Sequence, residues 1–571
     1  MKSIFLMQKT EELLKDISKT YGQESYSSVP KNYKKGRHKY IIVTGSVMSG
    51  IGKGVVSSSL ANLLKCHGLK ISPVKFDGYI NYDAGTLNPF RHGEVFVLED
   101  GTETDLDLGS YERFLNQNLS KDNSLTTGKI FKTIIDKERN GAYLGRDVQF
   151  IPHVTGEIKL FLRNLAIKTN ADITLVEVGG TVGDLENSYF LEAMRELAYE
   201  ENKDNVCFVN VTYIIKPSSL NEHKSKAAQL GIKMLMSLGI QPNIIVCRSN
   251  KPINNSVKEK VSIFSNVPIN KVVNVYNLST IYDTPLFLKS INLDKEILNM
   301  LNLKPRKLVK QDLTFKSWEN FVNKLKNVKK ELTVGITGKY TEVHDSYLSI
   351  LKALEHTAPY YNAKVNVKWI ETTDEKNIDK KLNDVDGIIV PGGFGKRGTE
   401  GKIACVKYAR ENNIPYLGLC YGFQMAVIEF ARNICNLKDA NSTEIDANTK
   451  HPVIDILPEQ KKLYGLGGNM RLGSHKVEVK RGTKAYSLYK SDYVNERFRH
   501  RFECNPEYIK LLEDHGMVFS GRAPKQEIMQ ILELPKHRYF IGTQFHGEMT
   551  SKPLHPSPLF KGFIEAMVNK L

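Results

Sequence analysis

One cysteine of the chain, Cys420, stands where an apolar strand-like run meets a helical pattern. The stretch reads Tyr416-Leu-Gly-Leu-Cys420-Tyr-Gly422-Phe-Gln, so the cysteine lies within a G-x-C-x-G sequence. This arrangement resembles the nucleophile elbow of G-x-S-x-G hydrolases, in which the nucleophile is exposed at the start of a helix. The helix dipole favours a thiolate at that position. Taken alone, Cys420 also fits a buried structural thiol.

A cysteine nucleophile needs a base and a group that orients the base. Gln544-Phe-His546-Gly-Glu548 offers both, and on an extended segment residues two apart face the same side. Backbone N–H groups of Gly393, after the run 387–390, and of Tyr421 are the predicted oxyanion donors. With all three features in this order, the sequence predicts covalent acyl transfer by a Cys420, His546 and Glu548 triad.

A second candidate site begins with Tyr40-Ile-Ile-Val-Thr-Gly45 and continues through a glycine-rich stretch to Lys53-Gly54. A strand, a glycine-rich loop and a helix form the geometry that binds phosphate through backbone N–H groups. The spacing departs from GxxxxGK[ST], because six residues separate Gly45 from Gly52 and no hydroxyl follows Lys53. A glycine-rich turn without a ligand is the alternative.

The missing hydroxyl means that a magnesium ion would need other oxygen ligands, typically one or two carboxylates and phosphates. Glu103-Thr-Asp105-Leu-Asp107 is one source, and Glu177, at the end of the apolar run 173–178, is the other. A carboxylate at the carboxyl end of a parallel strand lies where α/β sheets bind ligands. Lys224-Ser-Lys226-Ala-Ala-Gln229 predicts a second polyphosphate site with a base-reading amide, although its spacing also fits a solvated helix start.

Short apolar runs that alternate with helical patterns position these residues, and they predict parallel sheets covered by helices. The predicted strands are 40–44, 173–178, 206–215, 244–247, 332–337, 365–369, 387–390, 416–419 and 539–545, and the predicted helices are 8–20, 55–67, 188–200 and 318–330. A Lys- and Leu-rich stretch near 285–330 separates the two α/β series and is the candidate linker.

Composition narrows the class of protein. The chain has 571 residues, 41% hydrophobic and 25% charged, which is an ordinary globular composition. No apolar run reaches the ~18 residues that a membrane span needs. The net charge of +17 is compatible with anionic substrates, a nucleic-acid surface or a Lys-rich solvated face. No basic stretch is interleaved with aromatic residues, so a nucleic-acid partner is not predicted. A membrane partner is not predicted either. Seven cysteines without a CxxC pair favour a reducing, cytoplasmic compartment.

With both sites in view, the chain from about residue 39 onward resembles the CTP synthase family. The resemblance rests on seven strings: Lys75-Phe-Asp-Gly-Tyr-Ile-Asn81, His92-Gly-Glu-Val-Phe-Val97, Glu99-Asp-Gly-Thr-Glu-Thr-Asp-Leu-Asp107, Val176-Glu-Val-Gly-Gly-Thr-Val-Gly-Asp184, Pro391-Gly-Gly-Phe-Gly395, Asn441-Ser-Thr-Glu444 and Arg499-His-Arg-Phe-Glu503.

The resemblance implies two doubly wound α/β domains, a P-loop-type amidoligase domain and a class I glutamine amidotransferase domain. The predicted bounds are an N-terminal extension over 1–38, the amidoligase domain over 39–300, a linker over 301–330 and the amidotransferase domain over 331–571. The implied reaction is the ATP-dependent amination of UTP to CTP with ammonia from glutamine. The family also implies Mg²⁺, GTP as an activator, CTP as a feedback inhibitor, and homotetramers that in some members polymerise into filaments.

The resemblance also implies a role for each site residue. ATP would contact Gly50, Ile51, Gly52, Lys53, Gly54, Val55, Lys75, Asp107, Tyr276, Asn277 and Leu278, and Mg²⁺ would be held by Asp107 and Glu177. UTP or CTP would contact Ser49, Asp184, Leu185, Glu186, Lys224, Ser225, Lys226, Ala227, Ala228, Gln229 and Lys260. Glutamine would contact Gly393, Tyr421, Gly422, Phe423, Gln424, Glu444 and Arg501.

The chain departs from the family pattern at several positions. The family's His-Pro-Glu is His546-Gly547-Glu548 here, and Ala227-Ala228 replaces Pro-Thr in the pyrimidine motif. No departure removes a predicted catalytic group. Two other interpretations are a different glutamine-dependent P-loop amidoligase and a catalytically silent filament or regulatory homologue. The Lys224-x-Lys226 motif argues against the first, and the complete triad argues against the second.

Overall fold

A computed structural model describes residues 27–219, 222–307, 313–338, 343–456 and 470–569. The chain divides into two compact units. Unit 1 comprises residues 1–83 and 122–311, and unit 2 comprises 84–121 and 312–571. The predicted helix over 8–20 lies outside the described residues. In the part of the chain that the structure describes, every helix is too short or too polar to span a bilayer.

Unit 1 is built on a seven-stranded parallel sheet of order β5-β2-β6-β1-β7-β8-β9. Its strands are β1 (Lys39–Gly45), β2 (Ile71–Asp77), β5 (Ser124–Thr126), β6 (Ile173–Val178), β7 (Val206–Tyr213), β8 (Ile244–Ser249) and β9 (Val272–Tyr276). Strand β1 lies near the middle, and nearly all of its residues are buried because helices cover both faces.

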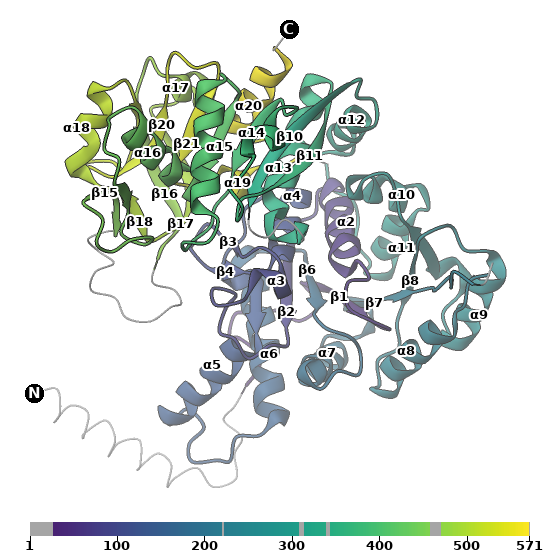
Figure 1. Cartoon of the computed structure of the whole chain (residues 1–571). Coiled ribbons are helices and arrows are strands. Elements are labelled where there is room, and N and C mark those ends of the chain that lie inside the picture. The colour runs from purple at the N-terminus through teal and green to yellow at the C-terminus, as the bar shows by residue number, and fades with distance from the viewer. Residues whose placement is uncertain (1–26, 220–221, 308–312, 339–342, 457–469, 570–571) are drawn as a thin grey trace, which may run out of the picture. The chain divides into compact units, whose positions relative to one another are not determined.

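The helices of unit 1 cover the two faces of this sheet. They are α2 (Lys53–Cys66), α5 (Thr127–Arg139), α6 (Thr155–Thr169), α7 (Ser188–Glu201), α8 (Lys226–Ser237), α9 (Asn255–Ser265), α10 (Thr284–Ser290) and α11 (Leu293–Met300), with η2 (Phe150–Val154) and η3 (Leu185–Asn187) among the short helices. Tyr40 and Ile42 of β1 join the core formed with α6 and α7. Figure 1 shows α2, α10 and α11 on one side of the strands, with α6 and α7 on the other.

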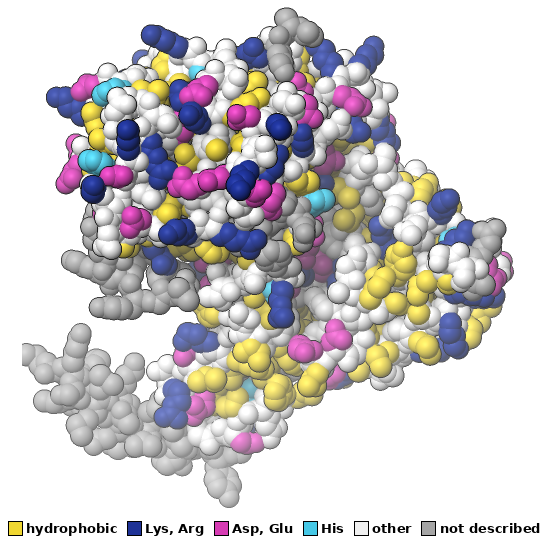
Figure 2. Space-filling model, in the orientation of Figure 1, with side chains coloured by type: hydrophobic (Ala, Val, Ile, Leu, Met, Phe, Trp, Pro, Cys, Tyr) yellow, Lys and Arg dark blue, Asp and Glu magenta, His cyan; other side chains and the backbone are white. Residues whose placement is uncertain are grey.

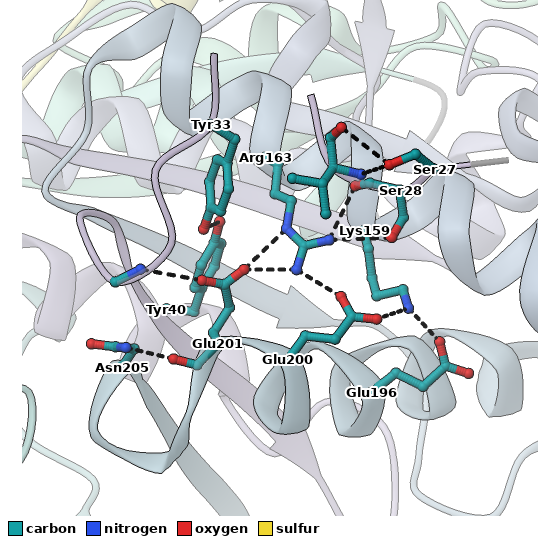
Figure 3. A network of polar contacts seen from close by, with 12 residues as sticks. Ser27, Ser28, Tyr33, Tyr40, Lys159, Arg163, Glu196, Glu200, Glu201 and Asn205 are labelled. Carbon is teal, nitrogen blue, oxygen red and sulfur yellow. Dashed lines mark hydrogen bonds and ion pairs between the residues drawn. The ribbon is translucent and has the colours of Figure 1, made fainter. Parts of the chain in front are cut away.

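The described end of the N-terminal segment packs on α6 and α7 through a buried arginine (Figure 3). The Arg163 guanidinium, 1% exposed, donates to the Ser28 carbonyl over 3.0 Å and to the carboxylates of Glu200 and Glu201 over 2.7 Å each. It also lies 5.3 Å from the centre of the Tyr33 ring. Because two carboxylates compensate a desolvated guanidinium here, this contact anchors residues 27–38 to unit 1.

Unit 2 is built on a nine-stranded mixed sheet of order β11-β10-β12-β13-β21-β20-β19-β16-β17. The strands from β11 to β21 in this order are parallel, and those from β20 to β17 are antiparallel. The bounds are β10 (Lys330–Gly338), β11 (Ala363–Glu371), β12 (Gly387–Val390), β13 (Tyr416–Leu419), β16 (Arg471–Val479), β17 (Tyr493–His500), β19 (Val518–Arg522), β20 (Met529–Glu533) and β21 (Phe540–Thr543).

Helices cover both faces of this sheet. Ile388 and Val390 of β12 pack with α15 and α16, whereas Ile389 packs with α13 and α20, as expected for alternating residues of a buried strand. The helices are α12 (Phe315–Lys326), α13 (Leu348–Thr357), α14 (Ile378–Leu382), α15 (Thr399–Glu411), α16 (Tyr421–Asn433), α17 (Lys484–Tyr489), α18 (Pro506–Asp514), α19 (Gly547–Thr550) and α20 (Pro558–Val568). A small sheet joins β14 (Ala440–Ser442), β15 (His451–Ile456) and β18 (Phe502–Cys504).

Residues 84–121 belong to unit 2 although they lie within the range predicted for the amidoligase domain. They form α3 (Pro89–His92), β3 (Phe96–Val97), β4 (Glu103–Thr104) and α4 (Leu106–Leu115). The Ser474 N–H donates to the Glu99 carbonyl over 2.8 Å, and the Glu94 N–H donates to the Asp345 carbonyl over 3.0 Å. Hydrogen bonds to residues far along the chain therefore hold this segment in the C-terminal unit.

The predicted strands 173–178, 387–390 and 416–419 have the bounds that the sequence indicated. The α/β fold class is confirmed. The antiparallel half of the second sheet and the short strands β3, β4 and β5 were not predicted, because strands of two or three residues show no period and the antiparallel strands alternate polar and apolar residues weakly.

Candidate functional site

Cys420 occupies a sharp turn between β13 and α16. Its φ of 51° and ψ of −95° are unusual for a residue with a side chain, and its N–H donates to the Thr543 carbonyl over 2.7 Å. The neighbouring strand β21 thus holds the strained turn in place. The thiol donates to the Arg499 carbonyl over 3.6 Å and accepts from Nε2 of Gln544 at the same distance, and the residue is 5% exposed.

His546 and Glu548 form a buried pair directly after β21. Nδ1 of His546 donates to Oε1 of Glu548 over 2.7 Å, and the two residues are 8% and 2% exposed. Burial lowers the pKa of His546, but the Glu548 carboxylate and the neighbouring Cys420 outweigh it and raise this pKa well above 6.5. A protonated imidazole beside Cys420 is the partner that a thiolate needs.

Two glycines allow the backbone to pass close to these groups. A Cβ at Gly392 would lie 2.9 Å from Cε1 of His546 and 3.8 Å from Cβ of Cys420. A Cβ at Gly422 would lie 2.1 Å from the Val390 carbonyl. The predicted oxyanion loop 391–395 therefore passes beside the base and the nucleophile, where only glycine fits.

Hydrogen bonds hold the predicted glutamine contacts in two places, around Gly395 and at Gln424. The Gly395 N–H donates to Oε1 of Glu444 over 2.9 Å, and the Tyr421 hydroxyl donates to the Gly395 carbonyl over 2.8 Å. Gln424 donates to the Phe502 carbonyl over 2.9 Å, which joins α16 to β18, directly after Arg501. Phe423 is fully buried in the core under α16, so only its main chain is placed to contact a ligand.

In unit 1, the predicted phosphate loop runs from β1 into α2. Gly50 and Gly52 have φ values of 71° and 85°, which a residue with a side chain rarely adopts. Lys53 begins α2 and donates from Nζ to the Gly180 carbonyl, in the loop after β6. Ser49, Ile51, Gly54 and Val55 lie in the same loop and the first turn of α2.

Lys75 and Glu177 lie side by side on β2 and β6, where they are paired in the register of the sheet. Lys75 Nζ lies 2.8 Å from Oδ1 of Asp77, and Glu177 is 1% exposed. Asp107 belongs to unit 2, in the first turn of α4. The two carboxylates predicted to hold magnesium therefore belong to different units.

Most of the predicted pyrimidine residues lie in two places in unit 1, the segment after β6 and the start of α8. Asp184 Oδ2 accepts from the Thr181 N–H over 2.7 Å, and a Cβ at Gly183 would lie 2.3 Å from Sδ of Met234 on α8. Leu185 and Glu186 continue the segment after β6 into η3. The contact with Met234 brings this segment to the helix that begins at Lys226.

The start of α8 carries the Lys-x-Lys motif. Gln229 Nε2 donates to the Ser225 hydroxyl over 2.9 Å, Lys224 pairs with Glu222, and Nζ of Lys226 lies 5.7 Å from the centre of the Phe264 ring. Ala227 and Ala228 lie in the first turn of α8, and Lys260 is exposed on α9. The structure thus keeps the motif together at the start of one helix, with Lys260 on the next.

Arg248, which the sequence analysis did not single out, joins two of the predicted ATP-binding segments. From the end of β8 it donates through Nε to the Ile51 carbonyl over 3.2 Å and through NH2 to Oδ1 of Asn277 over 3.1 Å. It also donates to the carbonyl of Tyr276 over 3.4 Å. Its position at the carboxyl end of a predicted parallel strand was the available signal.

Comparison with known families assigns both halves of the chain. Residues 39–303 match the family described as CTP synthase N-terminus, and residues 342–566 match glutamine amidotransferase class-I.

Curated relatives match over nearly the whole chain. A CTP synthase of Pyrococcus abyssi is 52% identical over 530 residues, which cover 92% of this chain and 97% of the relative. A CTP synthase of Caldanaerobacter subterraneus is 49% identical and covers 93% of this chain and 98% of its own. Among solved structures, a Trypanosoma brucei CTPS glutaminase domain with bound acivicin is 34% identical, with a TM-score of 0.40, and covers 42% of this chain and 95% of its own.

Proposed function

The chain belongs to the CTP synthase family, and from this premise we propose how its two units divide the reaction. The protein converts UTP to CTP with ATP and with nitrogen taken from glutamine. Unit 2 releases ammonia from glutamine, and unit 1 activates UTP and consumes the ammonia. The observation that carries the proposal is the buried contact of 2.7 Å between His546 and Glu548, next to Cys420 on a strained strand-to-helix turn.

In unit 2, Cys420 attacks the carboxamide carbon of glutamine to form a tetrahedral intermediate. The N–H groups of Gly393 and Tyr421 stabilise its oxyanion, and His546, held by Glu548, protonates the departing ammonia. His546 then takes a proton from water, which cleaves the thioester and releases glutamate. Gly422, Gln424, Glu444 and Arg501 hold the substrate, and Phe423 contributes only its main chain.

In unit 1, the O4 oxygen of UTP attacks the γ-phosphoryl group of ATP and ADP leaves. Ammonia then attacks C4, loses a proton and displaces phosphate. Lys53, at the start of α2, and Lys75 stabilise the charge on the transferred group by exchanging their protein oxygens for phosphate oxygens. Arg248 supports this site, because it fixes the loop at Ile51 against Asn277.

Magnesium fits the carboxylates that the chain offers. Asp107 and Glu177 are hard oxygen donors, and Glu177 is buried at the carboxyl end of β6, so a cation there would compensate its desolvated charge. When bound, the ion would neutralise charge on the phosphate oxygens. The segments 276–278 and 49–55 would hold ATP, while 184–186, 224–229 and Lys260 would hold UTP or the inhibitor CTP.

Self-association and regulation belong to the same proposal. Hydrophobic side chains gather on the face of unit 1 that carries α7 and α8 (Figure 2), and Tyr199, Leu185 and Leu230 are 85%, 82% and 59% exposed. An exposed apolar patch of this kind marks an interaction surface, and it supports a homotetramer that could extend into filaments. GTP acts as an activator of glutamine hydrolysis near the loop 391–395.

The test is a CTP assay with glutamine or an ammonium salt as nitrogen source, each with and without GTP. We expect CTP from both sources in the presence of ATP, UTP and Mg²⁺, with GTP stimulating only the reaction with glutamine. Absence of CTP with the ammonium salt would refute the proposal. ADP release that does not depend on UTP would instead indicate a different amidoligase.

A further inference from the structure

Strand β17 contacts both catalytic side chains through its main chain. The His546 N–H donates to the Arg497 carbonyl over 2.7 Å, and the Cys420 thiol donates to the Arg499 carbonyl over 3.6 Å. These two arginines are two residues apart on the strand, so their carbonyls and side chains are set by the same stretch of backbone. A small displacement of β17 would therefore move the nucleophile and the base relative to one another.

The side chains of the same two arginines are both paired with residues 84–121. Arg497 binds Glu112 of α4 through two hydrogen bonds of 2.8 and 3.0 Å, and both residues are 1% exposed. Its NH1 also donates to the Val97 carbonyl over 3.2 Å. Arg499 donates from Nε to Oε1 of Glu103 over 2.8 Å, and Glu103 is 1% exposed. The Glu112–Arg497 pair is buried and bidentate, so it fixes geometry as well as charge, whereas the Glu103–Arg499 pair has a single hydrogen bond.

The second oxygen of Glu103 distinguishes the two pairs. Oε2 is buried, and it has no hydrogen-bond partner among the residues that the structure describes. Both oxygens of Glu112 are used by Arg497, and Oε1 also accepts from the Leu119 N–H over 2.7 Å. The Glu112 pair is thus saturated, whereas the Glu103 pair has one oxygen left for a further donor.

Residues 84–121, whose carboxylates bind Arg497 and Arg499 of β17, also include Asp107, the residue proposed to contact ATP and Mg²⁺. Asp107 lies in the first turn of α4, and Glu112 lies on the same helix five residues later. Glu103 lies on β4, four residues before Asp107. A ligand that displaced Asp107 would therefore displace the carboxylates that hold Arg497 and Arg499.

We propose that the Glu112–Arg497 and Glu103–Arg499 pairs are positioning pairs that align Cys420 with His546 and make glutamine hydrolysis respond to nucleotides bound at Asp107. The inference rests on the proposed function and extends it. Neither glutamate touches glutamine or the reacting atoms, and both act through the carbonyls of β17. The coupling runs through one helix, two ion pairs and one strand, all within unit 2.

The test uses the full-length protein and the variant Glu103→Gln. Two rates are measured in each preparation, glutamate released from glutamine and CTP formed from an ammonium salt, and the first is measured with and without ATP, UTP and Mg²⁺. We expect kcat for glutamine hydrolysis to fall about 10- to 100-fold, as for a small misplacement of catalytic groups, with little change in KM. The stimulation by nucleotides should fall with it, and CTP formation from ammonia should stay within about twofold of the unchanged protein.

Glu429→Gln is the matched control. Glu429 is a fully buried carboxylate of unit 2 that Arg410 binds over 2.8 Å, and the pair joins α15 to α16 without a residue of β17. This variant should unfold at a lower temperature but keep the ratio of the two rates. The double variant Glu103→Arg with Arg499→Glu restores an ion pair of opposite polarity, and it should recover part of the lost hydrolysis.

Three results would overturn the inference: unchanged glutamine hydrolysis in Glu103→Gln, equal loss of both rates, or the same change of ratio in Glu429→Gln. If Glu103→Gln fails to fold, Arg499→Lys takes its place with the same expected selective loss. Failure of the proposed function itself is distinguishable, because the unchanged protein would then form no CTP from either nitrogen source.

Discussion

The two candidate sites are prepared for chemistry in different ways. In unit 2, Gln544 donates to the thiol of Cys420, His546 pairs with Glu548, and all four side chains are buried. In unit 1, the two lysines proposed to bind phosphate are each paired with a protein oxygen, Lys53 with the Gly180 carbonyl and Lys75 with Asp77.

The difference follows from the reaction that each site performs. Covalent catalysis needs a nucleophile and a base already at hydrogen-bond distance, so the fold itself must align them. Phosphoryl transfer needs positioned charges, and the phosphates and the metal ion complete the arrangement when they bind. The first site therefore depends on the protein core, and the second depends on side chains that change partners.

The largest expected effect comes from Cys420→Ala. We expect glutamine-dependent CTP formation to fall by about 10⁴-fold or more, as when the nucleophile of a catalytic triad is removed. CTP formation from an ammonium salt should persist, because unit 1 does not use the thiol. Cys405→Ala, at a fully buried thiol of α15, is the control and should retain glutamine-dependent activity. Loss of both activities in Cys420→Ala would contradict two separable sites.

The next effect concerns the orientation of the base, tested by Glu548→Gln. Removing this carboxylate should reduce glutamine hydrolysis by about 10³- to 10⁴-fold, since His546 loses the partner of Nδ1. It should also lower the pKa of His546, which Glu548 helps to raise, so the alkaline limb of the pH profile should move to lower pH. Hydrolysis measured against pH in both proteins checks both expectations.

The same pKa predicts the pH dependence of stability. The folded pKa of His546 is raised above its unfolded value of about 6.5, so the stabilisation that the protonated His546 gives is complete below pH 6.5 and is lost as pH rises through the folded pKa.

Glu496→Gln is the control for the pH profile of hydrolysis, because Glu496 accepts from the Tyr489 hydroxyl over 2.7 Å and has its own pKa raised to about 7 by burial. An alkaline limb that moves equally in both variants would show that Glu548 has no specific role.

A smaller effect should follow from Lys53→Met in unit 1. We expect CTP formation to fall about 10²- to 10³-fold with either nitrogen source, the usual cost of removing one group that stabilises a transition-state charge. Glutamate release should change far less, which separates the two sites in the direction opposite to Cys420→Ala. Lys132→Met, at an exposed lysine of α5 paired with Asp136, should leave both rates unchanged. Equal effects of the two lysine variants would remove Lys53 from the site.

The smallest effect is expected for Gly547→Pro, which restores the family's His-Pro-Glu sequence. Gly547 is the first residue of α19, where a proline needs no hydrogen bond from its nitrogen. An added Cβ would lie 3.0 Å from Cδ1 of Leu559, the end of a flexible side chain. We expect unchanged hydrolysis and a gain of about 0.4–1 kcal/mol in unfolding free energy, measured by denaturant titration. Gly547→Ala separates the added Cβ from the proline ring, and a loss of activity in both would show that the glycine itself is required.

Much of both sites was predictable from local sequence. The strands before Cys420 and the end of β6 at Glu177 were predicted at their observed bounds, because buried parallel strands are short continuous apolar runs. The close pairing of His546 with Glu548 was predicted from their spacing, but the extended segment expected there is wrong, because β21 ends at Thr543 and Glu548 lies in α19. Arg248 was missed although it follows a predicted parallel strand, because its partners Ile51 and Asn277 come from distant parts of the chain.

The sequence by itself therefore determined the strand–turn–helix units, the triad spacing and the family, because each depends on residues that are neighbours along the chain. Only the tertiary structure decided that residues 84–121 belong to the C-terminal unit and that Glu103 and Glu112 hold β17 beside the catalytic groups. Those contacts join residues almost 400 positions apart. The periodicity of the local sequence does not predict these ion pairs, because a buried charge is paired only when tertiary packing brings an opposite charge beside it.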